Sequence, residues 1–316
     1  SAGKKRLLLT WKVYKLLGKR AVYFIAFMVS LITYFLNKDI RKYSSNYFKV
    51  LYEYSKDNSL KPTKLNVFRH VLTYAFLLVD KMEVFSGNFK SENLVFENDE
   101  IKKELFRDLA CGGVFFICNH IGNVDIMRAL LKDKNLDITS KNNNPPLKVA
   151  PTISIFLQKD HCKIFRDFVE NLQLENEKNK IKFYPVEEIS LDTALIIEEN
   201  LKNGGAAFMA GDRVPLKNTE KVSELTFLNK KVQFPIGVFR FAKMMNTSIY
   251  LVSCLKEGAF KINGKYRIYL KKIEGNSEKN SKSKEIETIQ KEFILFMEKM
   301  VKIAPFQFFH FCDYFS

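Results

Sequence analysis

The stretch 112–125 contains residue types that can carry out proton-transfer chemistry. It reads Gly-Gly-Val-Phe-Phe-Ile-Cys-Asn-His-Ile-Gly-Asn-Val-Asp, so His120 follows the apolar run 114–118 and Asp125 lies five residues further on. A short β-branched and aromatic run is typical of a buried strand, whereas residues 126–131 have the pattern of a helix start. The sequence therefore predicts an imidazole leaving the end of a strand and a carboxylate at the mouth of a helix.

Gly122 lies where the chain must turn for these two side chains to meet. In a continuous helix, residues five apart point about 140° away from each other, but across a strand-to-helix turn they can face each other. Glycine permits such a tight bend. We expect Asp125 to accept a hydrogen bond from one imidazole nitrogen, which leaves the other nitrogen of His120 free as a general base. The alternative is a polar loop in which Asn123 or Asp125 only caps the helix.

Several blocks along the chain resemble one family of enzymes. Residues 120–125 resemble the H-x4-D motif of glycerolipid and lipid A acyltransferases, and they are most similar to the lauroyl/myristoyl branch of the bacterial lysophospholipid acyltransferase-like superfamily. Residues 208–215 resemble the G-D-R-x-P block of that branch. Residues 227–237 resemble its F-L-G…F-P-x-G block, with Asn229 at the usual glycine, and 305–309 resemble its terminal aromatic cluster. The F-P-E-G-T-R block of glycerolipid acyltransferases is absent, which argues against a glycerolipid acceptor.

This resemblance implies an O-acyltransferase. Such an enzyme moves a fatty acyl group from a thioester of acyl carrier protein or coenzyme A to a hydroxyl of a lipid or glycolipid. His120 would be the base and Asp125 its orienting carboxylate. The residues expected to bind substrate are Arg213, Asn119, Asn123, Gly122 and Asp212. Arg213 would bind a phosphate or neutralise charge near the carbonyl, or else pair with Asp212, and Asn119 or Asn123 would donate to the oxyanion.

The same sequence leaves other functions open. A thioesterase could use the same dyad on water, and a catalytically inactive scaffold could keep the same fold. A net charge of +16, from 51 Lys and Arg against 35 Asp and Glu, would also suit a nucleic-acid-binding protein. No nucleic-acid-binding signature is present, and the charge also suits an anionic membrane surface or an acidic carrier protein, so we expect no nucleic-acid partner.

Neither a metal nor a cofactor is expected. The four histidines are far apart in the sequence, and no H-E-x-x-H motif or Cys/His cluster is present. There is no P-loop and no G-x-G-x-x-G, and the absence of a G-x-S-x-G elbow argues against a serine acyl-enzyme. The five scattered cysteines favour reduced thiols in a cytosolic setting.

The N-terminal part carries an apolar segment with basic flanks. Residues 4–20 are basic and amphipathic, and residues 21–36 contain no charge. Sixteen residues are fewer than the ~20 that a spanning helix needs, so we expect a helix inserted in one leaflet or a single-helix anchor at the cytoplasmic face of the bacterial inner membrane. The alternative is a buried core helix.

Strands and helices alternate only after residue 110. The expected strands are 114–118, 147–150, 181–186, 206–210, 249–255 and 266–273. This alternation predicts an α/β fold with a mixed, mainly parallel central sheet flanked by helices, as in glycerolipid acyltransferases, with ligands at the carboxyl ends of the strands. We divide the chain into a helical, membrane-associated segment, 4–80, and an α/β acyltransferase domain, 81–316. His70 lies in an apolar helix and is expected in a core or interface, and His161 at the surface.

Overall fold

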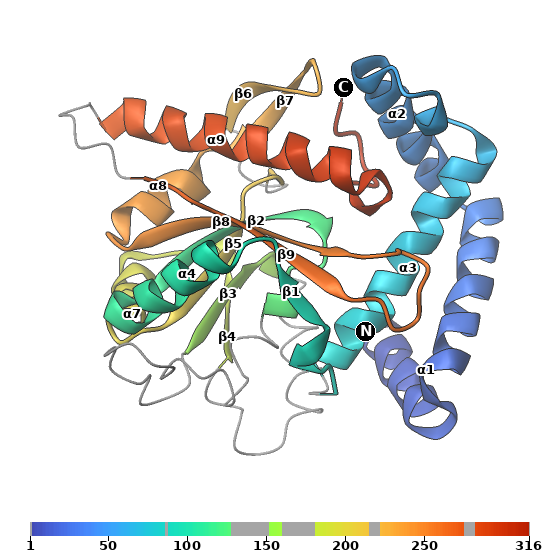
Figure 1. Ribbon diagram of the computed structural model, residues 1–316, viewed down its shortest axis with the longest axis horizontal. Coiled ribbons are helices and arrows are strands. Elements are labelled where there is room, and N and C mark those ends of the chain that lie inside the picture. Colours follow the sequence, from blue (N-terminus) through green and yellow to red (C-terminus); the bar gives the residue numbers. More distant parts are fainter. Residues whose placement is uncertain are drawn as a thin grey trace.

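A computed structural model of the chain describes residues 2–85, 88–127, 152–159, 181–214, 222–274 and 282–315. Its centre is a seven-stranded sheet with the order β1-β9-β8-β2-β5-β3-β4 (Figure 1). The strands are β1 (Leu94–Phe96), β2 (Val114–Gly122), β3 (Ile153–Leu157), β4 (Ile181–Pro185), β5 (Ala206–Ala210), β8 (Ser248–Lys256) and β9 (Tyr266–Lys272).

Most neighbouring strands run parallel. β2 pairs in parallel with both β5 and β8, and β3 lies in parallel between β5 and β4. Only the β8–β9 pair is antiparallel, and β1 runs parallel to β9. The predicted mixed, mainly parallel sheet is therefore confirmed. The carboxyl ends of five strands gather at one edge, where ligands bind in sheets of this kind.

Helices cover both faces of the sheet because side chains of a strand alternate between the faces. Phe115 and Ile117 belong to the core beneath α7 (Leu191–Lys202), α8 (Gly237–Met244) and α9 (Lys282–Ile303). Val114 and Phe116 pack on the other side, against α4 (Asp99–Gly112). Both faces of β2 are thus apolar, as its uninterrupted hydrophobic sequence predicts.

Local sequence signals explain where several elements begin and end. Ser190 caps α7 by accepting from the Thr193 N–H, and Thr193 bonds back in a capping box. A hairpin of β6 (Val222–Phe227) and β7 (Lys230–Pro235) was not foreseen. Its two-residue turn, 228–229, is left-handed at both positions, and Asn229 tolerates this conformation in place of glycine. The predicted strand 147–150 and His161 lie outside the described residues.

Three helices precede the α/β part and pack along its side (Figure 1). They are α1 (Ala2–Leu36), which bends at Gly18, α2 (Lys38–Ser55) and α3 (Lys64–Phe85). The domain boundary placed at residue 80 falls inside α3. Side chains of α2 and of the end of α3 are buried together with those of the sheet and its helices.

One stretch of α1 is apolar enough to cross a membrane. Leu16–Leu36 has a mean hydropathy of 1.6, and only 17% of its most apolar window is buried. Phe24 and Phe35 are each about two-thirds exposed. A core helix would bury such a stretch, so this helix has the length and the exposed apolar surface of a membrane anchor.

A buried ionic network joins α1 to α3 and to the sheet. Lys256 of β8 is fully buried, and its Nζ lies 2.7 Å from Asp80 Oδ2 and 2.7 Å from the Tyr23 hydroxyl. Tyr23 and Tyr266 both donate to the Asp80 carboxylate. Lys19 lies at the edge of the network, 3.5 Å from Asp80. The apolar helix is therefore fixed in its position relative to the sheet.

Candidate active site

The carboxyl end of β2 carries His120 as part of the strand. β2 continues through Gly122, with an irregularity in its pairing to β8 after Cys118. Gly122 has a φ of +78°, and a Cβ built there would lie 2.1 Å from the carbonyl oxygen of Cys254. Only glycine fits this close approach. The sequence predicted the bend at Gly122, but the chain leaves the strand later than expected, after His120 rather than before it.

The carboxylate bonded to His120 is Asp212, and this corrects the predicted pairing with Asp125. Nδ1 of His120 lies 2.8 Å from Asp212 Oδ1, and the backbone N–H of His120 donates to Asp212 Oδ2 at 2.6 Å. The reason is the register of the sheet. Cys118 of β2 pairs with Ala210, the last residue of β5, so His120 and Asp212, each two residues beyond this pair, lie side by side.

Asp125 instead faces α3. Its Oδ2 lies 2.6 Å from Nζ of Lys81. The chain turns at 124–125, and residues 126 and 127 are helical, as expected. Because β2 runs on to Gly122, this turn lies beyond the ring of His120, and the short H-x4-D spacing does not by itself close the dyad.

A second histidine, His310, completes the environment of Asp212. Its Nε2 lies 2.8 Å from Asp212 Oδ2, so the carboxylate is in contact with three N–H groups. Asp212 and His310 are both fully buried, whereas a third of the His120 side chain is exposed. Burial alone would raise the pKa of Asp212, but the interactions with His120 and His310 hold this pKa well below its usual value. Asp212 is therefore an anion at neutral pH.

The side-chain proton of each histidine follows from its partners. Nδ1 of His120 faces a carboxylate and carries a proton, so in the neutral imidazole the lone pair lies on Nε2, which makes no hydrogen bond within the described part of the chain. Burial lowers the pKa of His310 to about 4. His310 is thus neutral at pH 7, and its proton lies on the nitrogen that faces Asp212.

Two unpartnered donors lie near His120. Asn119 accepts from the Ile121 N–H and the Ser253 hydroxyl through Oδ1, while its buried Nδ2 has no partner among the residues that the structure describes. Arg213 donates through Nη2 to the carbonyl oxygen of Phe309 at 2.7 Å, and within the described part of the chain its buried Nε has no partner. The alternative ion pair between Arg213 and Asp212 is not formed. Buried donors without acceptors are costly, which points to a ligand acceptor at each.

The remaining predicted site residue, Asn123, is tied to the helical segment. Its Nδ2 donates to the carbonyl oxygen of Leu77 in α3, at 3.4 Å. Asn123 and Leu77 both line the cavity beside His120. Asn123 thus positions the loop after β2 against α3.

Two cavities meet at His120 and Arg213. The first, the loop cavity, has a volume of about 330 Å³ and extends from His120 to Asp125 and Lys81. The second, the apolar cavity, has a volume of about 360 Å³ and extends between Phe156, Val238 and Phe241. The residues lining both are His120, Phe156, Leu157, Ala210 and Arg213. An imidazole at the junction of two cavities can act on two substrates that meet there.

Comparison with known proteins assigns no family. No protein-family model matches the chain, and no curated protein matches it significantly. The geometry of the site therefore carries the functional argument, and the family resemblance stays a prediction.

His120, Asp212 and His310 together offer three possible metal ligands. Within this cluster, however, the nitrogen and oxygen atoms lie 2.8 Å apart in direct hydrogen bonds. The lone pairs that would bind an ion are used by N–H donors, and Asp212 and His310 are fully buried. The arrangement is better described as a hydrogen-bonded relay.

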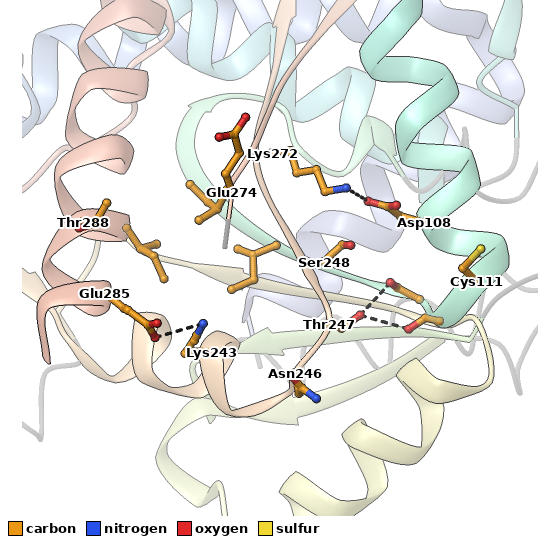
Figure 2. Close-up of a pocket in the computed structure, with 15 residues that line it drawn as sticks. Asp108, Cys111, Lys243, Asn246, Thr247, Ser248, Lys272, Glu274, Glu285 and Thr288 are labelled. Carbon is orange, nitrogen blue, oxygen red and sulfur yellow. Dashed lines mark hydrogen bonds and ion pairs between the residues drawn. The ribbon is translucent and has the colours of Figure 1, made fainter. Parts of the chain in front are cut away.

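A third cavity, of about 480 Å³, lies at the opposite, amino end of β2 and β8 (Figure 2). Figure 2 shows two ion pairs in its wall, Lys272 with Asp108 at 2.7 Å and Lys243 with Glu285 at 3.1 Å. Thr247 donates to the backbone just before β2. Both lysines already have carboxylate partners, and His120 does not line this cavity, so it is not part of the candidate site.

Proposed function

We propose that this protein is an O-acyltransferase that moves a fatty acyl group from a thioester to a hydroxyl of a lipid or glycolipid. The observation that carries the proposal is the state of His120. Its Nδ1 is held by the buried anion Asp212, its Nε2 makes no hydrogen bond within the described residues, and the side chain lines both the loop cavity and the apolar cavity. This is the arrangement that a general base needs when it must reach an acceptor hydroxyl beside an apolar donor chain.

The proposed reaction is a direct acyl transfer. The acceptor hydroxyl donates to Nε2 of His120, which removes the proton as the oxygen attacks the thioester carbonyl. Asp212 stabilises the imidazolium that forms. The C–S bond then breaks, and the imidazolium returns the proton to the leaving thiolate, so that one ester and one thiol are produced and the base is regenerated.

The oxyanion of the intermediate needs donors that are in place before the reaction. Nδ2 of Asn119 and Nε of Arg213 are buried, unpartnered and beside His120, which makes them the candidates. A guanidinium also suits a phosphate of the donor or acceptor. Preorganised donors of this kind contribute a large part of the rate enhancement of acyl transfer.

The substrates are assigned to the cavities by their chemistry. We assign the acyl chain to the apolar cavity, with Phe156, Val238 and Phe241, and the polar group of the acceptor to the end of the loop cavity that Lys81 and Asp125 line. Tyr74 and Leu78 of α3 line the loop cavity and are partly exposed. A lipid acceptor would then approach from a membrane in which α1 is anchored, and we place this at the cytoplasmic face of the bacterial inner membrane.

The test is to supply a labelled acyl thioester, of acyl carrier protein or of coenzyme A, with a total lipid extract in mixed micelles. Labelled lipid that forms only when the extract is present supports transfer. Labelled free fatty acid formed equally with and without the extract would identify a thioesterase instead. No product from either donor, with the protein folded, would favour an inactive scaffold. His120→Ala measured alongside separates the site from contaminating activity.

A further inference from the structure

The C-terminal segment 304–310 lies directly on the candidate site. Phe308 forms an isolated antiparallel bridge with Ile121. The next residue, Phe309, donates its N–H to the carbonyl oxygen of His120 at 2.9 Å, and its own carbonyl oxygen accepts from Arg213 at 2.7 Å. His310 follows, with Nε2 at 2.8 Å from Asp212. Phe309 and His310 thus contact the base, its carboxylate and the neighbouring guanidinium, and Phe308 pairs with the strand beside them.

The helical segment holds the same strap, residues 304–310, from its other side. The His70 ring donates through Nε2 to the carbonyl oxygen of Phe308 at 2.6 Å, and its Nδ1 accepts from Ser44 at 2.8 Å. The Tyr47 hydroxyl donates to the carbonyl oxygen of Pro305 at 2.7 Å. The strap is therefore fixed between the N-terminal helices and the end of β2, so His310 has little freedom to leave Asp212.

We propose that His310 is a positioning residue, which donates from Nε2 to Asp212 Oδ2 and so keeps Oδ1 turned toward Nδ1 of His120. Its place in catalysis rests on the acyl transfer proposed above, but the hydrogen-bonded relay itself does not. The second ring nitrogen of His310 is buried and has no partner among the described residues, so within this part of the chain donation to Asp212 is its one hydrogen bond. A packing residue would not need an imidazole there, because an apolar ring would fill the same space without an unpartnered nitrogen.

The proposal predicts how the site changes when this donor is lost. When a buried carboxylate loses one hydrogen-bond donor, its negative charge is less stabilised and interacts more strongly with the remaining partner. The protonated form of His120 is therefore favoured. Loss of a hydrogen bond to a charged group should change the proton affinity of His120 about tenfold. The midpoint of its protonation, measured by pH titration, should therefore rise by about one pH unit. The other titratable groups acting on Asp212 or His310 are Cys118, Arg213, Cys312 and Tyr314.

Two amide substitutions separate donation from bulk. In His310→Gln the amide nitrogen can take the place of Nε2, whereas in His310→Asn it falls short of Asp212, near the place of Nδ1. Each full-length variant is treated with diethyl pyrocarbonate over a range of pH, and peptide mass spectrometry gives the rate at His120, which is partly exposed. The pH profile of kcat/KM for acyl transfer and the melting temperature are measured in parallel. If the asparagine variant does not fold, His310→Phe, which keeps the ring, takes its place.

We expect the asparagine variant to raise the midpoint of His120 by about one pH unit in both profiles, with activity recovered at higher pH, and the glutamine variant to stay near wild type. Equal midpoints in all three proteins would overturn the proposal. The proposal would also be overturned if both variants lost activity equally and showed lower melting temperatures but no shift in the His120 midpoint. Because carbethoxylation does not need acyl transfer, a shifted midpoint in a protein without transferase activity would keep the relay and reject the proposed function.

Discussion

Replacing the two candidate carboxylates one at a time separates the sequence motif from the three-dimensional site. In Asp212→Asn the side chain keeps its shape, but one of its oxygens becomes an NH₂ group. There are two outcomes for this fully buried amide. In the first, its NH₂ group faces an N–H of His120 or His310, so that two donors meet. In the second, the NH₂ group donates to Nδ1 of His120, which becomes an acceptor. The second outcome puts the proton on Nε2 and removes the base. We expect turnover to fall about 10³- to 10⁴-fold, as for other histidine bases that lose their orienting aspartate.

Asp125→Asn is the matched control. It removes an ion pair with Lys81 that is partly exposed, and it leaves the tautomer of His120 unchanged. We expect a loss of less than about tenfold, with a change in stability of about 1 kcal/mol. The double variant His120→Ala/Asp212→Asn should be barely slower than His120→Ala, because the two residues act as a unit.

The assay is the initial rate of acyl transfer from a labelled thioester to the lipid extract, with thermal melting of each variant. Near wild-type turnover in Asp212→Asn, together with a loss in Asp125→Asn as large as in His120→Ala, would refute the reasoning. It would mean that the H-x4-D spacing, and not the strand register, sets the dyad.

Four further predictions concern anchoring, stability and metal dependence. Deleting 21–36 should release the protein from membranes or make it aggregate. The full chain should bind anionic vesicles in a salt-sensitive way, with about 1 kcal/mol of binding free energy per engaged Lys or Arg. Equal binding to neutral and anionic vesicles at low salt would contradict this electrostatic contribution. Lys256→Met leaves Asp80 buried without its nearest cation and should cost about 3–5 kcal/mol in the free energy of unfolding, measured by denaturant titration. Burial lowers the pKa of His70 and His310 to about 4, so as the pH falls these histidines are protonated in the unfolded chain before they are protonated in the folded chain. The free energy of unfolding should therefore be constant above about pH 6.5 and fall between pH 6.5 and 4, by up to about 3 kcal/mol for each histidine. A chelator should leave the rate of acyl transfer unchanged, and loss of activity that added zinc restores would show that the relay is a metal site.

The fold was largely predictable because its signals are local. Apolar runs of strand length, the cap at Ser190 and the alternation after residue 110 each depend on neighbouring residues. The strand β3 at 153–157 and the β6–β7 hairpin were missed. The hairpin turn has no glycine, and Leu228 adopts a left-handed conformation that its side chain does not favour.

The site was predicted only in part because its decisive contacts are long-range. His120 and Asp212 were both singled out, but which carboxylate bonds the histidine depends on β5 lying next to β2 in register, which no single sequence reveals. The signal that could have found the pair is that each lies just past the end of a predicted strand. His310 was overlooked because it is 190 positions from His120 in the sequence. Only its place at the end of an aromatic cluster hinted at a buried role.

The central claim is that Nε2 of His120 is the base for acyl transfer, and turnover of His120→Ala tests it most directly. Its melting curve is measured alongside to show that the variant is folded, because His120 is also a partner of the buried Asp212. Its rate of transfer from the thioester to the lipid acceptor should fall about 10²- to 10⁴-fold. A folded His120→Ala protein that transfers acyl groups at nearly the wild-type rate would contradict the account.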